Sequence, residues 1–449
     1  MQRALVLLIV AACTQRPQAP STTPPSITWH VAIDPSFVVS EQLCWEGFDP
    51  GGIEPELAAA RDFARIHGAT RGTKGCVDLA IDLARGAAKL DDDASLERIG
   101  DAVTGSFDGW LWHPHLWPKG LVGRLFLDLG PGLQASLPNE RASDGSWLVP
   151  WSTWSFMARF AVGKLAPDPV DVGGARITIT NVGAAPRMTR EGLRRFVAEA
   201  AAAVATIDGG KLPTDRIQLL LTPVHGELRH EGPVVFGMAM RGAGPSVSLR
   251  LTDDATDDNV RGEWIAVHEL AHLWLPPIER ESSWLSEGMA SYYQCILRSR
   301  AGMYGEVAGW EELLAGFERG RRHASVSLSS PPRRGSMQTY WGGAAIVFKL
   351  DVALHKRGSS LDRALVALRR REPDTGEAMA RIDDRPALAV LEDLLAETPG
   401  IDVEPWLRLP FADTTEELLE LGVRGNGDHV TLDDAAPLAS VRRAIAGRR

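Results

Sequence analysis

Residues 268–293 read HELAHLWLPPIERESSWLSEGMASYY, and the interpretation of the whole chain starts from this stretch. Apolar residues recur at helical spacing on both sides of Pro276-Pro277, which predicts two helices separated by a turn. The first helix is expected to begin at Asp257-Asp258-Asn259, whose side chains can cap it, and to end near Leu275. The connection that follows is long enough for the chain to reverse and place the second helix antiparallel to the first.

The two predicted helices carry the residues of a metal site. His268 and His272 are four residues apart, so both imidazoles project from one face of the first helix. Glu287 opens the second helix, with fourteen residues between it and His272, and can supply a third ligand. Such donors are typical of catalytic zinc sites, which leave a position open for a water whose pKa falls from about 15.7 towards about 7. Because Glu269 can accept that proton, the stretch predicts one zinc ion per chain and hydrolytic chemistry.

The H-E-x-x-H pattern alone also arises by chance on amphipathic helices. Here it coincides with a second signal, the W-L-S-E-G start of another helix at a workable distance. Two independent features that supply one ligand set favour a metal site over coincidence.

The same stretch resembles a known family. HELAHLWLPP followed by WLSEGMASYY is similar to the gluzincin metallopeptidases, specifically the glycyl aminopeptidase family, and less closely to the aminopeptidase N family. Similar segments recur at Ser299 to Gly302, Tyr340 to Ala345 and Ser360 to Asp362. The resemblance implies hydrolysis of peptide bonds in a peptide or protein substrate. Its zinc ligands would be His268, His272 and Glu287, and its general base would be Glu269.

By the same resemblance, Tyr340 is expected to donate a hydrogen bond to the developing oxyanion. In relatives this tyrosine belongs to a Y-x-K-G segment, whereas Gly342 replaces the lysine here. The alternative interpretation is a packing tyrosine at the start of a helix.

One departure bears on specificity. Relatives hold the free amine of the substrate with a glutamate in a glycine-containing strand before the zinc helix, but residues 236–246, FGMAMRGAGPS, contain no carboxylate. Gly237, Met238, Ala239 and Met240 are still predicted to bind the substrate backbone by edge addition. The departure leaves endopeptidase activity, or a protein that binds peptides without cleaving them, as alternatives to an aminopeptidase. A lipoprotein whose metal serves folding alone would need a fourth protein ligand, which these motifs do not show.

The chain of 449 residues, 44% apolar and 24% charged, is long enough for several folded units. We predict an α+β multidomain protein with a β-rich N-terminal domain over 27–166, a thermolysin-like mixed α/β core over 172–302 and a mostly helical region over 303–449. In the first domain, strands are expected at Ile27–Ile33, Cys76–Leu83, Leu121–Leu129 and Trp147–Trp154, and a helix at Pro55–Ile66. In the core, a helix is expected at Arg190–Ile207 and strands at Ile177–Ile179, Ile217–Thr222, Val234–Phe236 and Val247–Leu251, with 237–244 as an edge strand or loop.

The N-terminus predicts export. A short apolar run from Ala4 to Ala12 follows Arg3, which is typical of a signal peptide over 1–13, too short to span a bilayer. Val10 to Cys13 resembles a bacterial lipobox, which implies lipidation of Cys13 and a lipid anchor in the cell envelope. The alternative is an ordinary secretory signal in which Cys13 is incidental. Residues 14–26, rich in Pro, Ser and Thr, are expected to form a tether.

Charge and cysteine content narrow the partners and the compartment. The net charge of −10 and the short basic runs argue against a nucleic-acid partner. In an oxidising compartment Cys44 and Cys76 could pair, and Cys295 is expected to be a buried thiol. No C-x-x-C spacing indicates a cysteine metal site.

Two further clusters invite a metal interpretation. His113-Pro114-His115 lies between Trp112 and Trp117, and we favour an aromatic core at a turn over a chelating site. The acidic runs Asp253-Asp254 and Asp91–Asp93 have no ligand spacing and are interpreted as loops rather than calcium sites.

Overall fold

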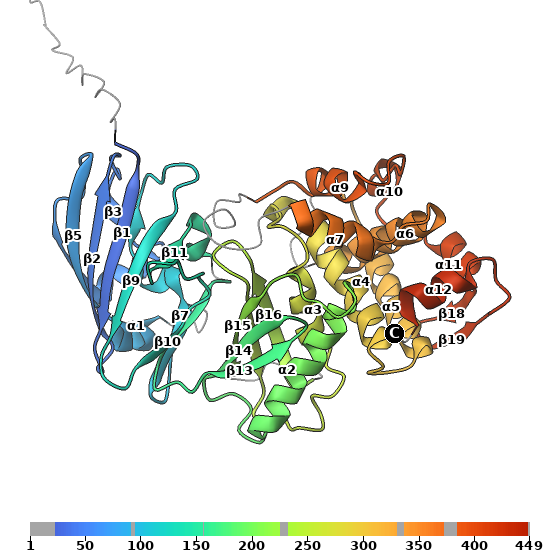
Figure 1. Cartoon of the computed structure of the whole chain (residues 1–449), viewed down its shortest axis with the longest axis horizontal. Helices are drawn as coiled ribbons and strands as arrows, with labels where there is room; N and C mark the ends of the chain where they lie inside the picture. Colours follow the sequence, from blue (N-terminus) through green and yellow to red (C-terminus); the bar gives the residue numbers. More distant parts are fainter. Residues whose placement is uncertain are drawn as a thin grey trace, which may run out of the picture.

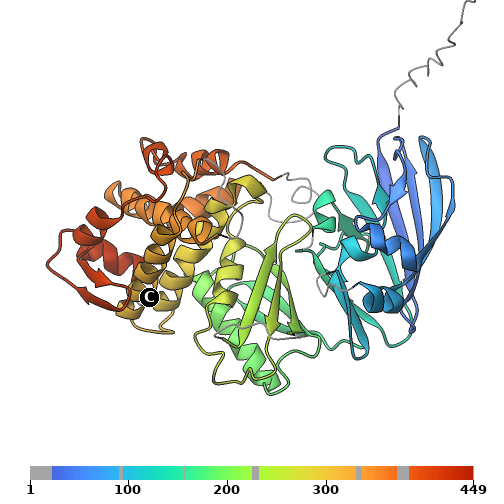
Figure 2. The ribbon, with the colours of Figure 1, turned by 180° about the vertical axis from the view of Figure 1, so that it is seen from behind.

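The computed structural model describes residues 23–90, 95–155, 157–224, 232–329, 336–371 and 384–447. Two β-sheets, a five-stranded sheet and a helical region follow one another along the molecule, and both views show the five-stranded sheet in the middle (Figures 1 and 2). The predicted α+β architecture is therefore confirmed. The predicted signal peptide, Cys13, most of the tether and Asp91–Asp93 lie outside the described residues.

The N-terminal part has two main sheets whose inner faces share one apolar core, and a two-stranded sheet formed by β3 and β8. The larger sheet has the strand order β11-β9-β1-β2-β5-β4, and the smaller one has the order β10-β12-β7-β6. Buried and exposed residues alternate along β2, as expected of a strand with one face on a core. The elements are β1 Ser26–Ile33, β2 Val38–Glu46, β3 Ile53–Glu54, η1 Ala58–Phe63, β4 Ala64–Gly68, β5 Lys74–Asp82, α1 Leu83–Lys89, β6 Leu96–Ile99, β7 Ala102–Ser106, η2 Phe107–Gly109, β8 His113–Pro114, β9 Gly123–Leu129, β10 Gln134–Ser136, β11 Trp147–Val149, η3 Trp151–Trp154 and β12 Arg159–Gly163.

Two predictions for this part were wrong. The helix expected at Pro55–Ile66 is a 3₁₀ turn, η1, followed by β4, because residues from Ala64 onward pair antiparallel with β5. The strand expected at Trp147–Trp154 ends at Val149, because Pro150 has no N–H for a ladder and the 3₁₀ helix η3 follows.

The cysteines have distinct environments. Cys44 and Cys76 are directly opposite each other on β2 and β5 and form a disulfide, which resolves the pairing that the sequence left open. Cys295 is buried as a free thiol, as predicted. The bond joins two neighbouring strands of the larger sheet.

Glu41 is a charged residue on the inner face of β2. Its side chain is 2% exposed, and neither carboxyl oxygen has a hydrogen-bond partner. Burial raises the pKa of Glu41 well above its ordinary value of 4.5. The folded protein therefore holds a proton that the unfolded chain releases, so this residue lowers stability as the pH rises above about 4.5, up to the raised pKa of the folded state.

We expect Glu41→Met to stabilise the protein by about 1 to 3 kcal/mol at neutral pH, because it removes a buried polar group without a partner. Thermal unfolding of the full chain measures the change. Near pH 4 the gain should shrink, since both states of the wild type are then largely protonated. Gln42→Met, on the exposed face of the same strand, serves as the control and should change stability by less than about 0.5 kcal/mol. A destabilised Glu41→Met protein would contradict this account.

The five-stranded sheet lies between the N-terminal sheets and the helices. Its order is β13-β14-β15-β17-β16, with β16 at one edge, antiparallel to β17. Along β15, Leu219 and Leu221 face the helices, whereas Leu220 faces the smaller N-terminal sheet. The elements are β13 Asp168–Val172, β14 Ala175–Asn181, α2 Arg190–Ala205, β15 Arg216–Pro223, β16 Val234–Met240 and β17 Ser246–Leu251. The predicted strand at Val234–Phe236 thus continues to Met240, and part of the glycine-rich segment is an edge strand.

The helical region contains both helices of the HELAH stretch. Its helices are α3 Ile265–His272, α4 Trp284–Arg300, α5 Glu306–Arg322, α6 Gly343–Lys356, α7 Leu361–Arg371, α9 Ala387–Leu395, α10 Glu404–Leu407, α11 Thr415–Leu421 and α12 Ala439–Ala446, with short helical turns η4 Arg280–Ser282 and η5 Gln338–Gly342. A hairpin of β18 Val423–Asn426 and β19 His429–Leu432 lies within this mostly helical part. Among the described residues, no helix is both long and apolar enough to span a bilayer.

The start of the first helix was predicted wrongly. Helix α3 begins at Ile265, not at Asp257-Asp258-Asn259, and Glu263 accepts hydrogen bonds from the first backbone N–H groups. Asp257 instead accepts from the backbone N–H and the hydroxyl of Thr189, the residue before α2. An acidic cluster can cap any nearby helix, so its tertiary partner could not be identified from spacing alone.

Candidate metal centre

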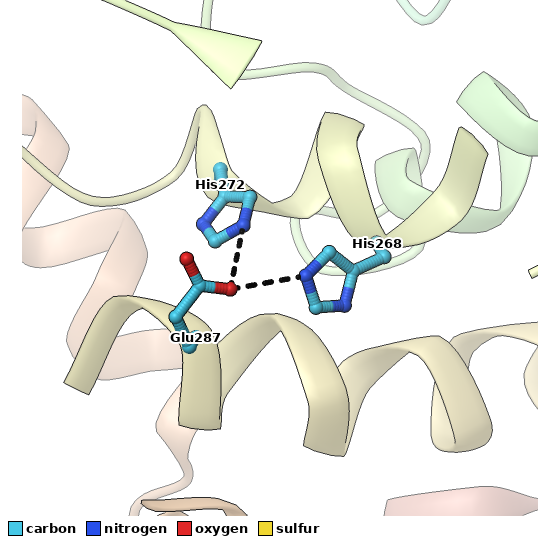
Figure 3. Close-up of side chains that lie close together, drawn as sticks. All are labelled: His268, His272 and Glu287. Atoms are coloured by element: carbon cyan, nitrogen blue, oxygen red, sulfur yellow. Dashed lines mark hydrogen bonds and ion pairs between the residues drawn. The ribbon is translucent and has the colours of Figure 1, made fainter. Parts of the chain in front are cut away.

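Helices α3 and α4 pack against each other, and the three predicted metal ligands lie between them (Figure 3). A close crossing of α4 with α6 fixes α4 in place. A Cβ atom added to Gly288 would lie 2.3 Å from the backbone carbon of Gly343, so both positions require glycine for this approach. Gly288 directly follows Glu287. The contact between α4 and α6 therefore helps to fix the position of the Glu287 backbone.

The two histidines and Glu287 converge as the sequence predicted. Glu287 Oε2 lies 3.3 Å from His268 Nε2 and 3.6 Å from His272 Nε2. One ligand atom from each residue lies within 4.8 Å of the other two. All three side chains are mostly buried: His268 is 5% exposed, His272 13% and Glu287 26%. Both rings therefore present Nε2 to one small space beside a carboxylate.

The opposite ring nitrogens are held by residues that the sequence analysis did not single out. His268 Nδ1 lies 2.8 Å from Gln294 Oε1, and His272 Nδ1 lies 2.8 Å from Ser286 Oγ. The spacing contained a signal for the first contact, because Gln294 follows Glu287 by two helical turns on the same face of α4. Partners of this kind fix the tautomer and the orientation of a metal-binding imidazole.

The carboxyl groups at the centre have opposite pKa shifts. Burial raises the pKa of Glu269 to about 7; the charge of His268 opposes this increase, and a smaller effect of the Glu287 charge adds to it. Burial also disfavours ionisation of Glu287, but the charges and hydrogen bonds of His272 and His268 outweigh it and hold the pKa of Glu287 well below its ordinary range. The protein thus provides one ionised carboxylate for a cation and one carboxyl group suited to proton transfer.

Strand β16 passes directly over Glu269. A Cβ atom on Gly237 would lie 2.5 Å from Glu269 Cγ and 2.7 Å from Ile265 Cγ2, so only glycine allows the strand to come this close. Met238 and Ala239 follow, partly exposed, and Met240 is buried at the end of the strand. The predicted substrate-binding residues therefore form an edge strand beside the predicted general base.

Aromatic rings flank His268 on two sides. Tyr340, on the π-helical turn η5, has its ring centroid 6.1 Å from that of His268. Trp264, one turn before His268, meets the imidazole edge to face at 5.8 Å. Tyr340 thus reaches the centre from a separate segment of the chain. Its role as an oxyanion donor stays a prediction.

The donor set fits zinc. Two imidazole Nε2 atoms and one carboxylate oxygen are ordinary zinc ligands, and their Nδ1 atoms already have partners in the protein. His113 and His115 do not join this group. The His113 ring is buried against Trp151 and Trp154, at centroid distances of 5.2 and 4.9 Å, as expected for the aromatic interpretation.

The fold of this chain is similar to that of solved structures, although its sequence matches no family model. No protein-family model matches the chain, and no curated protein matches it in sequence. Among solved structures, an aminopeptidase N family protein from Idiomarina loihiensis matches with a TM-score of 0.61 and 16% identity, over 88% of this chain and 78% of that one. An M1 zinc metallopeptidase from Deinococcus radiodurans, a mutant bound to a Tyr-Ser-Ala substrate, matches with a TM-score of 0.52 and 14% identity, over 86% and 94%.

Yeast LTA4 hydrolase in complex with bestatin also matches, with a TM-score of 0.50 and 12% identity, over 91% of this chain and 73% of that one. At these identities the likeness establishes the architecture. The chain therefore has the multidomain α+β fold of the M1 zinc metallopeptidases.

Proposed function

We propose that this protein is a zinc-dependent peptidase that hydrolyses peptide bonds with a water molecule activated at the His268, His272 and Glu287 centre. The observation that carries the proposal is the convergence of these ligand atoms within 4.8 Å, with Glu269 buried beside them under an edge strand. The fold supports it, because the structures that it resembles include zinc metallopeptidases.

Each residue has a chemical task in this proposal. A zinc ion held by His268, His272 and Glu287 would supply Lewis-acid polarisation of the scissile carbonyl and would lower the pKa of water. Glu269 accepts the proton of the attacking water and passes it to the leaving amine. Tyr340 donates a hydrogen bond to the carbonyl oxygen as negative charge develops there. The free edge of β16 aligns the substrate backbone from Gly237 to Met240 by strand addition.

We propose an aminopeptidase-like enzyme close to the glycyl aminopeptidases, and endopeptidase action is a second candidate. The second candidate is favoured by the composition of β16, which between Val234 and Met240 contains no carboxylate to pair with a substrate ammonium. A buried ammonium without a partner would oppose binding of a free N-terminus. A blocked or internal peptide would not meet this cost.

We further propose that the protein is exported and tethered to a membrane of the bacterial cell envelope by a lipid at Cys13. The sequence of residues 1–26 supports this location. The Cys44–Cys76 disulfide suits an oxidising compartment.

The proposal predicts about one zinc per purified chain and loss of peptide hydrolysis on chelation, with recovery when zinc is restored. Metal analysis and a fluorogenic peptide assay measure both. Each peptide is offered with a free and with an acetylated N-terminus. Faster cleavage of the free-amine form supports an aminopeptidase, and faster internal cleavage of the acetylated form supports an endopeptidase. A zinc-loaded protein that cleaves neither form of any peptide in a diverse library would refute the proposed function.

A further inference from the structure

The hydrogen bonds at Nδ1 of the two histidines share one property, which is that both partners are uncharged. Gln294 accepts through an amide oxygen at 2.8 Å from His268 Nδ1, and Ser286 lies at the same distance from His272 Nδ1. In many metal centres this place is taken by a carboxylate. Here the ionised carboxylate is Glu287, which faces the Nε2 atoms of both rings rather than their Nδ1 atoms.

Of the two partners, Gln294 is expected to have the larger effect on the metal centre, because its contact with His268 is buried. Gln294 and His268 are both 4% exposed, so solvent has little access to replace the amide oxygen. Ser286 is only partly buried, and the His272 side chain is 13% exposed. If the Ser286 hydroxyl is removed, a water molecule can take its place as the partner of His272 Nδ1. If the Gln294 amide is removed, the buried Nδ1–H of His268 has no acceptor.

The Gln294 contact selects one tautomer of His268. A carbonyl oxygen can only accept a hydrogen bond, so Nδ1 is the donor, and of the two neutral tautomers the one with its lone pair on Nε2 is favoured. Nε2 is the atom that faces Glu287 and the metal position. The amide thus orients the ring so that Nε2 is the nitrogen directed towards Glu287 and the candidate metal site.

We propose that Gln294 is a positioning residue of the metal centre, and that its neutral amide keeps zinc affinity below the level that a carboxylate at this position would give. The inference rests on the proposed function only in taking zinc as the metal. A carboxylate would accept a charge-assisted hydrogen bond from Nδ1, make Nε2 a stronger donor and add negative charge beside the cation. The amide supplies orientation without that charge.

The test measures zinc affinity of the full chain by competition with a chromogenic chelator, without any substrate. Gln294→Leu should raise the zinc Kd by about 10- to 100-fold, because it removes the acceptor. Gln294→Glu should lower the Kd by about 10-fold, a gain that a purely structural role would not produce. Tyr293→Phe is the matched control. Tyr293 is on α4 beside Gln294, and the change removes a buried 2.9 Å hydrogen bond from Tyr293 to Asp362 on α7. This variant should have a lower melting temperature but a zinc Kd within about twofold of the wild type.

Equal changes of the Kd in Gln294→Leu and Tyr293→Phe would overturn the proposal, because the effect would then come from loosening α4. Weaker or unchanged zinc binding in Gln294→Glu would overturn it too, and that variant remains informative if Gln294→Leu does not fold. Affinity is measured without peptide hydrolysis. A protein that binds zinc with the expected order of affinities but cleaves no peptide would therefore uphold this inference and refute the proposed function.

Discussion

Glu269→Gln is expected to lower kcat for peptide hydrolysis by about 10² to 10⁴-fold while the protein keeps about one zinc per chain. Glutamine has the shape of glutamate but cannot accept the proton of the attacking water. Its side chain does not belong to the three-ligand group, so metal binding should survive the change. Steady-state kinetics together with metal analysis of the same sample measure the two quantities.

Folding should not suffer in this variant. Burial raises the pKa of Glu269 to about 7, so the wild-type carboxyl group is costly to ionise where it lies, and a neutral amide removes that cost. We expect a melting temperature equal to or above that of the wild type. Glu281→Gln, an exposed change of the same charge in η4, is the control and should leave kcat unchanged. Wild-type rates in Glu269→Gln would exclude Glu269 as the general base.

The ligand set could be predicted from the sequence because its geometry is local. His268 and His272 are one helical turn apart, and Glu287 begins the next helix, so the spacing alone nearly determines their meeting. The structure brings them together as predicted. The same holds for β1, which alternates buried with more exposed residues and matches the strand expected at Ile27–Ile33.

Features that depend on distant partners could not be predicted in this way. Glu41 alternates in β2 like its apolar neighbours, and its burial follows only from the second sheet that covers it. Ala64 to Ile66 were expected to end a helix, but pairing with β5 outweighed the local preference. Asp257 binds Thr189, the N-cap residue of α2, instead of capping the helix that follows it. In each case a tertiary contact decided between two locally acceptable outcomes.

Gly237 shows how a site can constrain sequence without contributing a side chain. The segment around it was interpreted as an edge strand or a loop, and its glycine carried no chemical signal. The structure gives the reason, since any Cβ atom there would displace Glu269 or Ile265. The close approach places the edge strand next to Glu269, the proposed general base, where a peptide backbone would pair with the strand in the proposed function.

Glu287→Gln is expected to abolish both zinc binding and hydrolysis, in contrast to Glu269→Gln, which loses only the second. Glu287 supplies the carboxylate among the three ligand atoms, and its Oε2 is the atom nearest both Nε2 atoms. The neighbouring histidines hold its pKa well below the ordinary range, so it is ionised at neutral pH and offers full negative charge to a cation. An amide offers a weaker, neutral donor, and zinc content should fall from about one per chain to near zero after dialysis.

Thermal unfolding gives an independent measurement of this loss. A ligand that binds only the folded state raises stability by an amount that grows with its concentration, so added zinc should raise the melting temperature of metal-free wild type. The shift should vanish in Glu287→Gln and persist in the Glu281→Gln control. Retention of stoichiometric zinc by Glu287→Gln would remove Glu287 from the ligand set. Because the proposed chemistry needs a metal held by both helices, that result would also remove the main structural argument for a peptidase.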